Sequence, residues 1–206
     1  MRRDFDSAWR LKLAQLAVGR EDDARNRSPN LSGEPSSLLG AMVDAALAVR
    51  ETAEDSPHQS AAALRKIDAL RTLIAERADP IVSGIALCRK VITFGVYEEM
   101  PAEELISGRT IQVIVYSEVE NFHSRTTDEN AYETVLGTRI EVFTQDGDSV
   151  WQRDEPEVID VCRNRRRDFF VAQRVMLPPT LPAGQYVLKV RVEDKLAGKA
   201  AESIRN

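Results

Sequence analysis

The amino-acid sequence predicts an α+β protein, with an N-terminal helical hairpin region over residues 1–79 and an antiparallel β-sandwich over residues 80–206. Two observations predict this class. Before Pro80 the apolar residues recur with a period of about 3.6, which is typical of amphipathic helices. After Pro80 they alternate with a period of about 2, in short runs separated by Pro and Gly, which is typical of strands.

The helical region is predicted to hold three helices and one linker. The first helix covers residues 4–18, where apolar residues from Phe5 to Leu16 share one face and Gly19 provides a stop. Residues 20–36 are polar and contain Pro and Gly, so we expect a mobile linker there.

The second and third helices are predicted to form an antiparallel hairpin, because only a short connection separates them. The second begins at Ser36 or Ser37, and the third runs from about His58 to Ala78. The apolar face of the second helix consists of Leu39, Met42, Val43, Ala46, Leu47 and Val49. The face of the third consists of Ala61, Leu64, Ile67, Leu70 or Arg71, and Ile74. Two helices alone cannot bury these faces, so we expect them to pack on the first helix or on the sandwich, with a homodimer through the helices as the alternative.

The C-terminal region is predicted to hold eight short strands. They cover residues 82–90, 92–98, 110–119, 132–144, 148–153, 167–177, 185–193 and 199–205. Asp146-Gly147 between two of these runs is a strong hairpin signal. Strands of this number and spacing indicate an immunoglobulin-like or fibronectin-like sandwich. The Cys and Trp spacing of true immunoglobulin domains is missing, so the prediction concerns the architecture alone.

Composition and charge exclude several classes of function. The chain has 206 residues and a net charge of −5, which argues against non-specific binding to nucleic acid. No apolar run approaches the roughly 18 residues that a membrane-spanning helix needs. The first residues lack the apolar stretch of a signal peptide, so we expect a cytoplasmic protein, or an exported one if the sequence has been trimmed.

Five segments of the sandwich region carry a resemblance to a known family: residues 85–97, 115–122, 162–170, 181–186 and 192–199. They resemble an uncharacterised module of planctomycete bacterial proteins. The resemblance covers about 120 residues and leaves the helical region out. It implies the sandwich fold and a bacterial lineage. It transfers no catalytic residue, because the module has no known function.

The most distinctive local feature is an arginine-rich segment. It consists of Arg163, Arg165, Arg166, Arg167 and Asp168. Because the planar guanidinium group suits carboxylate and phosphate, the segment is a candidate surface for an anionic ligand or a protein partner. The alternative is structural pairing with nearby acids, among them Glu118, Glu120 and Asp160. On an alternating strand, Arg165 and Arg167 would share one face and Arg166 the other.

Two other groups suggest chemistry with a weaker signal. Glu118 and Glu120 lie on one face of a predicted strand, so they could serve as the acid and base of a hydrolase or of an accessory carbohydrate-active protein. With Asp128 and Glu129 they could instead bind a cation such as calcium. His123 has no second histidine placed beside it, and no metal site is predicted.

Cys88 and Cys162 are expected to be buried free thiols, with a disulfide between them as the open alternative. The sequence contains no nucleophile elbow, zinc motif or phosphate-binding glycine loop. We therefore expect no enzymatic activity and no cofactor. The sequence favours a non-enzymatic binding or structural module whose partner is a protein or an anionic ligand.

Overall fold

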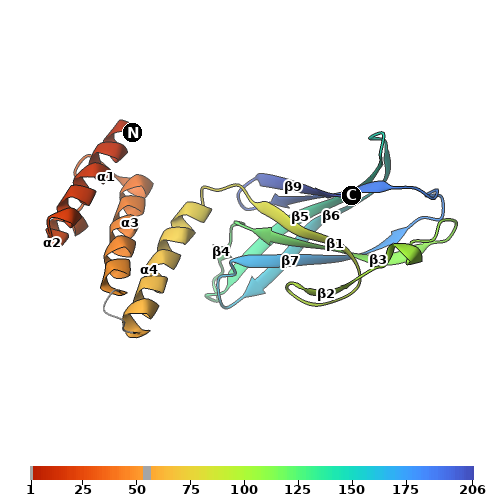
Figure 1. Cartoon of the computed structure of the whole chain (residues 1–206), viewed down its shortest axis with the longest axis horizontal. Coiled ribbons are helices and arrows are strands. Elements are labelled where there is room, and N and C mark those ends of the chain that lie inside the picture. Colours follow the sequence, from red (N-terminus) through yellow and green to blue (C-terminus); the bar gives the residue numbers. More distant parts are fainter. Residues whose placement is uncertain (1, 53–56) are drawn as a thin grey trace. The chain divides into compact units, whose positions relative to one another are not determined.

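A computed structural model describes residues 2–52 and 57–206 of the chain (Figure 1). It divides into two compact units, Met1–Arg77 and Ala78–Asn206. The first unit is helical, and the second consists of two antiparallel sheets that form a sandwich. The α+β class predicted from the sequence is therefore confirmed.

The described part of the helical unit contains four helices. They are α1 (Arg2–Ala17), α2 (Glu21–Arg25), α3 (Gly33–Glu51) and α4 (Pro57–Ala75). Within residues 2–52 and 57–206, none of the helices is long and apolar enough to cross a membrane. The sequence predicts only three helices, and the additional one, α2, lies inside the segment predicted as a linker.

Lys12 of α1 holds the polar segment over residues 20–36 against the rest of the helical unit. Its side chain is buried, and its ammonium group donates hydrogen bonds to the backbone carbonyls of Asp23 (3.0 Å) and Asn26 (2.6 Å). These carbonyls lie at the C-terminal end of α2, where a positive charge is favourable. Ala24 of α2 packs on α3 in a small buried cluster. The contacts join residues far apart in sequence, so the local pattern of residues 20–36 does not reveal them.

The packed face of α4 differs from the predicted one. Leu64 is 61% exposed and Ile74 is 51% exposed, whereas the small residue Ala63 is only 4% exposed. An exposed ion pair between Lys66 and Asp44 (2.8 Å) also joins α4 to α3. The α3 face agrees with the prediction at three buried positions: Leu39, Val43 and Leu47. Helix α4 thus packs through small side chains and leaves an apolar stripe exposed in its own unit.

The sandwich unit contains nine strands and one 3-10 helix. They are β1 (Ile81–Thr93), β2 (Val96–Glu99), η2 (Ala102–Glu104), β3 (Ile111–Glu120), β4 (Arg125–Thr126), β5 (Tyr132–Thr144), β6 (Ser149–Cys162), β7 (Asp168–Leu177), β8 (Tyr186–Asp194) and β9 (Lys199–Arg205). One sheet has the order β2-β1-β3-β7. The other has the order β4-β5-β8-β9, with β6 also paired to β5.

The core lies between the two sheets and follows from strict alternation along the strands. Its buried members include Val113, Val115, Val119, Leu136, Ile140, Val142, Leu188, Val190 and Val192. Successive side chains of a strand point to opposite faces, so every second residue of β3, β5 and β8 enters this layer. This is the pattern on which the strand prediction rests.

Strand β6 is longer than predicted, because it continues past residue 153 to Cys162. Pro156 and several charged residues hide this continuation in the sequence. The strand pairs only with β5, so it is an edge strand, and an edge tolerates proline because one side of the backbone needs no partner. The register with β5 shifts between Leu136 and Thr138, opposite Pro156.

A second apolar cluster covers the outer face of the first sheet. The β1–β2 hairpin folds over Tyr116, whose side chain is 0% exposed. The backbone N–H of Gly95 donates to the Tyr116 hydroxyl (2.8 Å), and the rings of Tyr97 (4.6 Å between centroids) and Phe170 (5.7 Å) pack on it. Gly95 adopts φ 69°, a left-handed conformation that glycine allows at this turn.

Candidate functional site

The arginine-rich segment forms the loop between β6 and β7 rather than part of a strand. Only Asp168 belongs to β7, where it pairs with Glu120 of β3. The four arginines precede the strand and are exposed. The predicted alternation of their side chains across two faces is therefore wrong, because the turn from one sheet to the other occupies these residues.

The structure gives Arg166 a structural contact. Its guanidinium group pairs with Asp160 of β6 (2.8 Å) and lies over the ring of Phe169 (5.7 Å to the centroid). Arg165 and Arg167 also have interaction partners. Within the described ranges 2–52 and 57–206, Arg163 has no hydrogen bond, ion pair or ring contact. The sequence left two alternatives for these arginines, pairing with nearby acids or an exposed surface for a partner. Arg166 is paired and Arg163 is exposed without a partner among the described residues, so the loop contains an example of each.

The two carboxylates of the hydrolase alternative project from the outer face of the first sheet. The Tyr116 hydroxyl donates to Glu118 (2.8 Å), and the Glu118 side chain lies directly against Gly84. A Cβ atom at Gly84 would come within 2.8 Å of the Glu118 carboxyl carbon, so this contact requires glycine. Glu120 lies at the end of β3 and also has an interaction partner.

Both cysteines are free thiols in the structure, and the disulfide left open by the sequence is absent from it. Cys88 lies in β1 and Cys162 ends β6, so the two belong to different sheets. Burial raises the pKa of Cys88 to about 11, and the nearby Glu99 carboxylate adds to this effect while Arg205 opposes it. The Cys162 thiol donates to the carbonyl of Asn164 (2.8 Å).

His123 is bound to a buried carboxylate that the sequence analysis did not single out. Asp194 lies at the end of β8, and its side chain accepts hydrogen bonds from the backbone and ring of His123. Among the described residues, no group of three or more His, Cys, Asp or Glu side chains is arranged to hold a metal ion. The structure thus places His123 in a structural contact.

The most developed site is a cavity of about 500 Å³ between the sheets. Its floor is formed by core residues of both sheets, including Val115, Ile140 and Leu188. Trp151 of β6 forms part of its wall. Strand β7 begins at the arginine loop and ends at Leu177 beside this cavity, so the two features lie at opposite ends of the sandwich.

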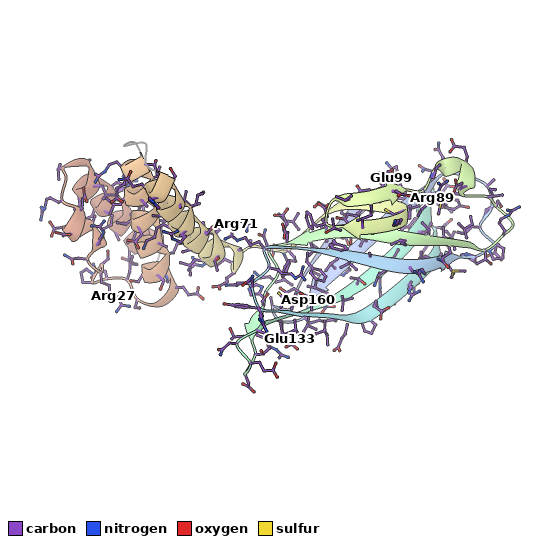
Figure 2. The ribbon with its side chains drawn as sticks, turned by 90° about the horizontal axis from the view of Figure 1, so that it is seen from below. Arg27, Arg71, Arg89, Glu99, Glu133 and Asp160 are labelled. Atoms are coloured by element: carbon purple, nitrogen blue, oxygen red, sulfur yellow. The ribbon has the colours of Figure 1, made fainter. Side chains whose placement is uncertain are left out.

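Two loops enclose the mouth of the cavity. One spans residues 100–110 and the other residues 178–185, and both contribute lining residues. The Ser107 hydroxyl donates to the carbonyl of Leu181 (2.9 Å), which links them. Arg89 of β1 forms an ion pair with Glu104 of η2 and anchors the first loop. Figure 2 shows Arg89 and Glu99 toward one end of the sandwich and Asp160 and Glu133 toward the other.

Three charged side chains line the cavity: Glu99, Arg109 and Arg205. Arg205 binds Glu99 through two nitrogens (2.9 and 3.4 Å) and also donates to the carbonyl of Ile85 (2.8 Å). These two charges compensate each other. For Arg109, no hydrogen bond, ion pair or ring contact is found within residues 2–52 and 57–206. The cavity therefore has apolar walls and one uncompensated positive charge.

Two segments of the sequence that border this cavity have a composition unlike that of the strands. Leu105 and Ile106 are apolar residues in a segment without strand alternation, and Pro178 to Gly184 is a proline-rich loop. The predicted strands leave residues 99–109 and 178–184 between them. Their meeting over a shared space depends on the tertiary fold, so the pattern of residues did not indicate a site there.

These features define a β-sandwich module with a preformed apolar cavity. No family model matches the chain, and no curated protein matches it. Partial similarity to solved structures exists. A β-glucuronidase from glycoside hydrolase family 2 aligns with 18% identity over 49% of this chain and 10% of its own length, with a TM-score of 0.33.

Two further structures show similarity at the same low level. A β-glucuronidase of Bacteroides uniformis aligns with 8% identity over 61% of this chain and 12% of its own length, with a TM-score of 0.33. The alkylpurine DNA glycosylase AlkC of Pseudomonas fluorescens aligns with 13% identity over 82% of this chain and 47% of its own length, with a TM-score of 0.30. The chain thus spans about a tenth of the glucuronidases, and scores this low carry no argument about function.

Proposed function

We propose that this chain is a non-enzymatic binding module whose sandwich holds a small ligand in the cavity between its sheets. The observation that carries the proposal is the cavity itself. Its volume of about 500 Å³ lies within the range of roughly 300–1,000 Å³ that is usual for ligand sites. Its walls are largely apolar and a few polar groups lie at its mouth, which is the usual composition of such sites.

The arginine loop remains a candidate surface for an anionic protein partner within the same proposal. Its support is the exposed side chain of Arg163. The support is weaker than that of the cavity, because Arg166 is already paired with Asp160 and stacked on Phe169. The four arginines of the loop do not line the cavity at the other end of the sandwich.

The alternative of a hydrolase using Glu118 and Glu120 has less support. Glu118 accepts a hydrogen bond from Tyr116 and lies against Gly84, and neither carboxylate lines the cavity. A glycosidase needs its two carboxylates on either side of a bound sugar. Two residues on one face of a single strand do not provide this arrangement.

The resemblance to the planctomycete module is also kept as a proposal about the family. It is supported by where its segments fall, since they cover parts of β1, β3, β7 and β8 and the loop that encloses the cavity. It implies no activity, and it is compatible with a binding module.

Trp151 allows a direct test of the proposed function. The chain has two tryptophans, and the other, Trp9, lies in α1, so Trp9→Phe leaves Trp151 at the cavity wall as the only reporter. We expect small apolar molecules such as 1-decanol to shift the emission of Trp151 saturably. Ala183→Phe, which adds a ring at the exposed mouth, is expected to abolish the shift.

The matched control for this test is Ala69→Phe, which places the same ring on an exposed position of α4. It should leave the emission shift unchanged. Near-ultraviolet circular dichroism of both variants verifies that the sandwich remains folded. A saturable shift that Ala183→Phe leaves intact, or no shift at all, would contradict a ligand site in this cavity.

A further inference from the structure

We propose that the ligand of this cavity is a free amphipathic molecule with a single anionic head group, of the class of a medium-chain carboxylate. This inference rests on the proposed function and names the ligand class of the same site. The apolar body lies between the sheets, and the head group binds the guanidinium group of Arg109.

The apolar body is indicated by the walls. Val115, Ile140 and Leu188 are buried core residues that form the floor, and Trp151 and Leu177 add apolar surface at the sides. Removing an alkyl chain from water contributes about 0.8 kcal/mol per buried methylene. A polar group placed against these apolar side chains would lose its hydration without gaining hydrogen-bond partners from them.

The anionic head group is indicated by the balance of charge at the mouth. Among the three charged side chains that line the cavity, Arg205 and Glu99 neutralise each other through two hydrogen bonds. Arg109 is left with no partner in the described part of the chain. An arginine can bind a carboxylate through two parallel hydrogen bonds, so one monoanion completes the charge balance.

The position of Arg109 suits this role. It directly follows Gly108, which adopts φ 82°, and it precedes β3 by a single residue. The arginine therefore lies where the loop over residues 100–110 joins the first sheet. Its side chain is exposed and also lines the cavity, so a head group can bind it while still in contact with water.

The enclosure favours a free small molecule over a strand of a partner protein. Lining residues come from both sheets and from both loops, and the Ser107–Leu181 hydrogen bond closes the loops on each other. A partner strand would instead add to an open sheet edge, where backbone groups lie unpaired. The cavity floor consists of side chains in the middle of paired strands and offers no such edge.

The test uses the full chain with Trp9→Phe, and it compares three ten-carbon probes below their micellar concentrations. These are decanoate, neutral 1-decanol and cationic decyltrimethylammonium, with Trp151 emission as the readout. We expect decanoate to bind about tenfold more tightly than 1-decanol, as a hydrogen-bonded charge pair at the mouth implies. The cationic probe should bind more weakly than either.

Two substitutions assign this preference to one residue. Arg109→Gln should lower decanoate affinity to that of 1-decanol and leave 1-decanol unchanged. Arg109→Glu should reverse the preference toward decyltrimethylammonium. The control Arg163→Gln removes an unpaired exposed arginine at the opposite end of the sandwich and should change no affinity.

The outcomes separate the ligand class from the proposed function. If decanoate and 1-decanol bind equally, or if Arg109→Gln has no effect, the anionic class is overturned, while binding that Ala183→Phe blocks still supports the module. If no probe binds the full chain, both the ligand class and the proposed function are overturned. If decanoate still binds tightly to the Ala183→Phe variant, the cavity is not its binding site.

Discussion

The side chain of Asp194 binds His123 through both the backbone and the ring of that residue. The backbone N–H of His123 donates to Asp194 Oδ2 at 2.7 Å, and Nδ1 donates to the same oxygen at 2.9 Å. The other oxygen, Oδ1, accepts the backbone N–H groups of Leu196 (3.0 Å) and Ala197 (3.1 Å). Asp194 is 0% exposed, so four hydrogen bonds replace its lost hydration.

Replacing this carboxylate should therefore destabilise the sandwich. We expect Asp194→Ala to lower the free energy of unfolding by about 3 kcal/mol, because several buried N–H groups lose their acceptor. Urea denaturation followed by Trp151 emission in the Trp9→Phe background measures the change. The control Asp154→Ala breaks an exposed ion pair with Arg139 and should cost less than about 1 kcal/mol. Equal losses in the two variants would refute the role given to Asp194.

The free energy of unfolding should decline at high pH because of Tyr116 and Cys88, two buried groups in the apolar cluster on the outer face of the first sheet. Burial raises the pKa of Tyr116 from 10.0 to about 12, and raises that of Cys88 from 9.0 to about 11. Each group is charged only after losing its proton, and the folded state holds the proton more tightly than the unfolded state. The stabilisation is therefore complete below about pH 9 and is lost as the pH rises toward 12.

This decline can be assigned by substitution. Cys88→Ala should remove the earlier part of the loss, between pH 9 and 11, and Tyr116→Phe the later part, between pH 10 and 12. Free energies of unfolding measured at intervals of half a pH unit provide the comparison. A double variant whose stability declines as steeply as that of the parent would show that other groups control this range.

The two thiols should differ strongly in reactivity. Cys88 is fully buried with a raised pKa, so little thiolate forms at neutral pH, whereas Cys162 is partly exposed. We expect a maleimide reagent to label the native protein once at neutral pH and the unfolded protein twice, as counted by mass spectrometry. Cys162→Ser should abolish the fast labelling. No labelling of the unfolded, unreduced protein would instead indicate a disulfide.

The homodimer through the helices remains a prediction, and the exposed stripe of α4 provides its test. If two copies pair through Leu64 and Ile74, light scattering should give twice the mass of one chain, and the melting temperature should rise with concentration. Leu64→Glu should then yield monomers. Leu11→Glu, at an exposed position of α1, is the matched control and should leave the mass unchanged. A monomer at all concentrations would exclude this assembly.

Much of the fold could be predicted because its signals are local. Alternating residues such as Val113 and Val115 place one face of β3 in the core, and the predicted bounds of this strand agree closely with the structure. The continuation of β6 past Pro156 was missed, since only its place at the edge of a sheet makes proline acceptable. The buried face of α4 was predicted wrongly, because the spacing of apolar residues does not show which face of a helix contacts its neighbour.

The sequence by itself determined the α+β class, most strand positions and the candidate charges, because each depends on residues close together in the chain. Only the tertiary structure decided which of those charges are paired. It joined Asp194 to His123 across 71 positions, and it joined Ser107 to Leu181 across 74. The cavity also depends on the tertiary structure, because it is bounded by two sheets and two loops whose meeting is set by packing over long sequence separations.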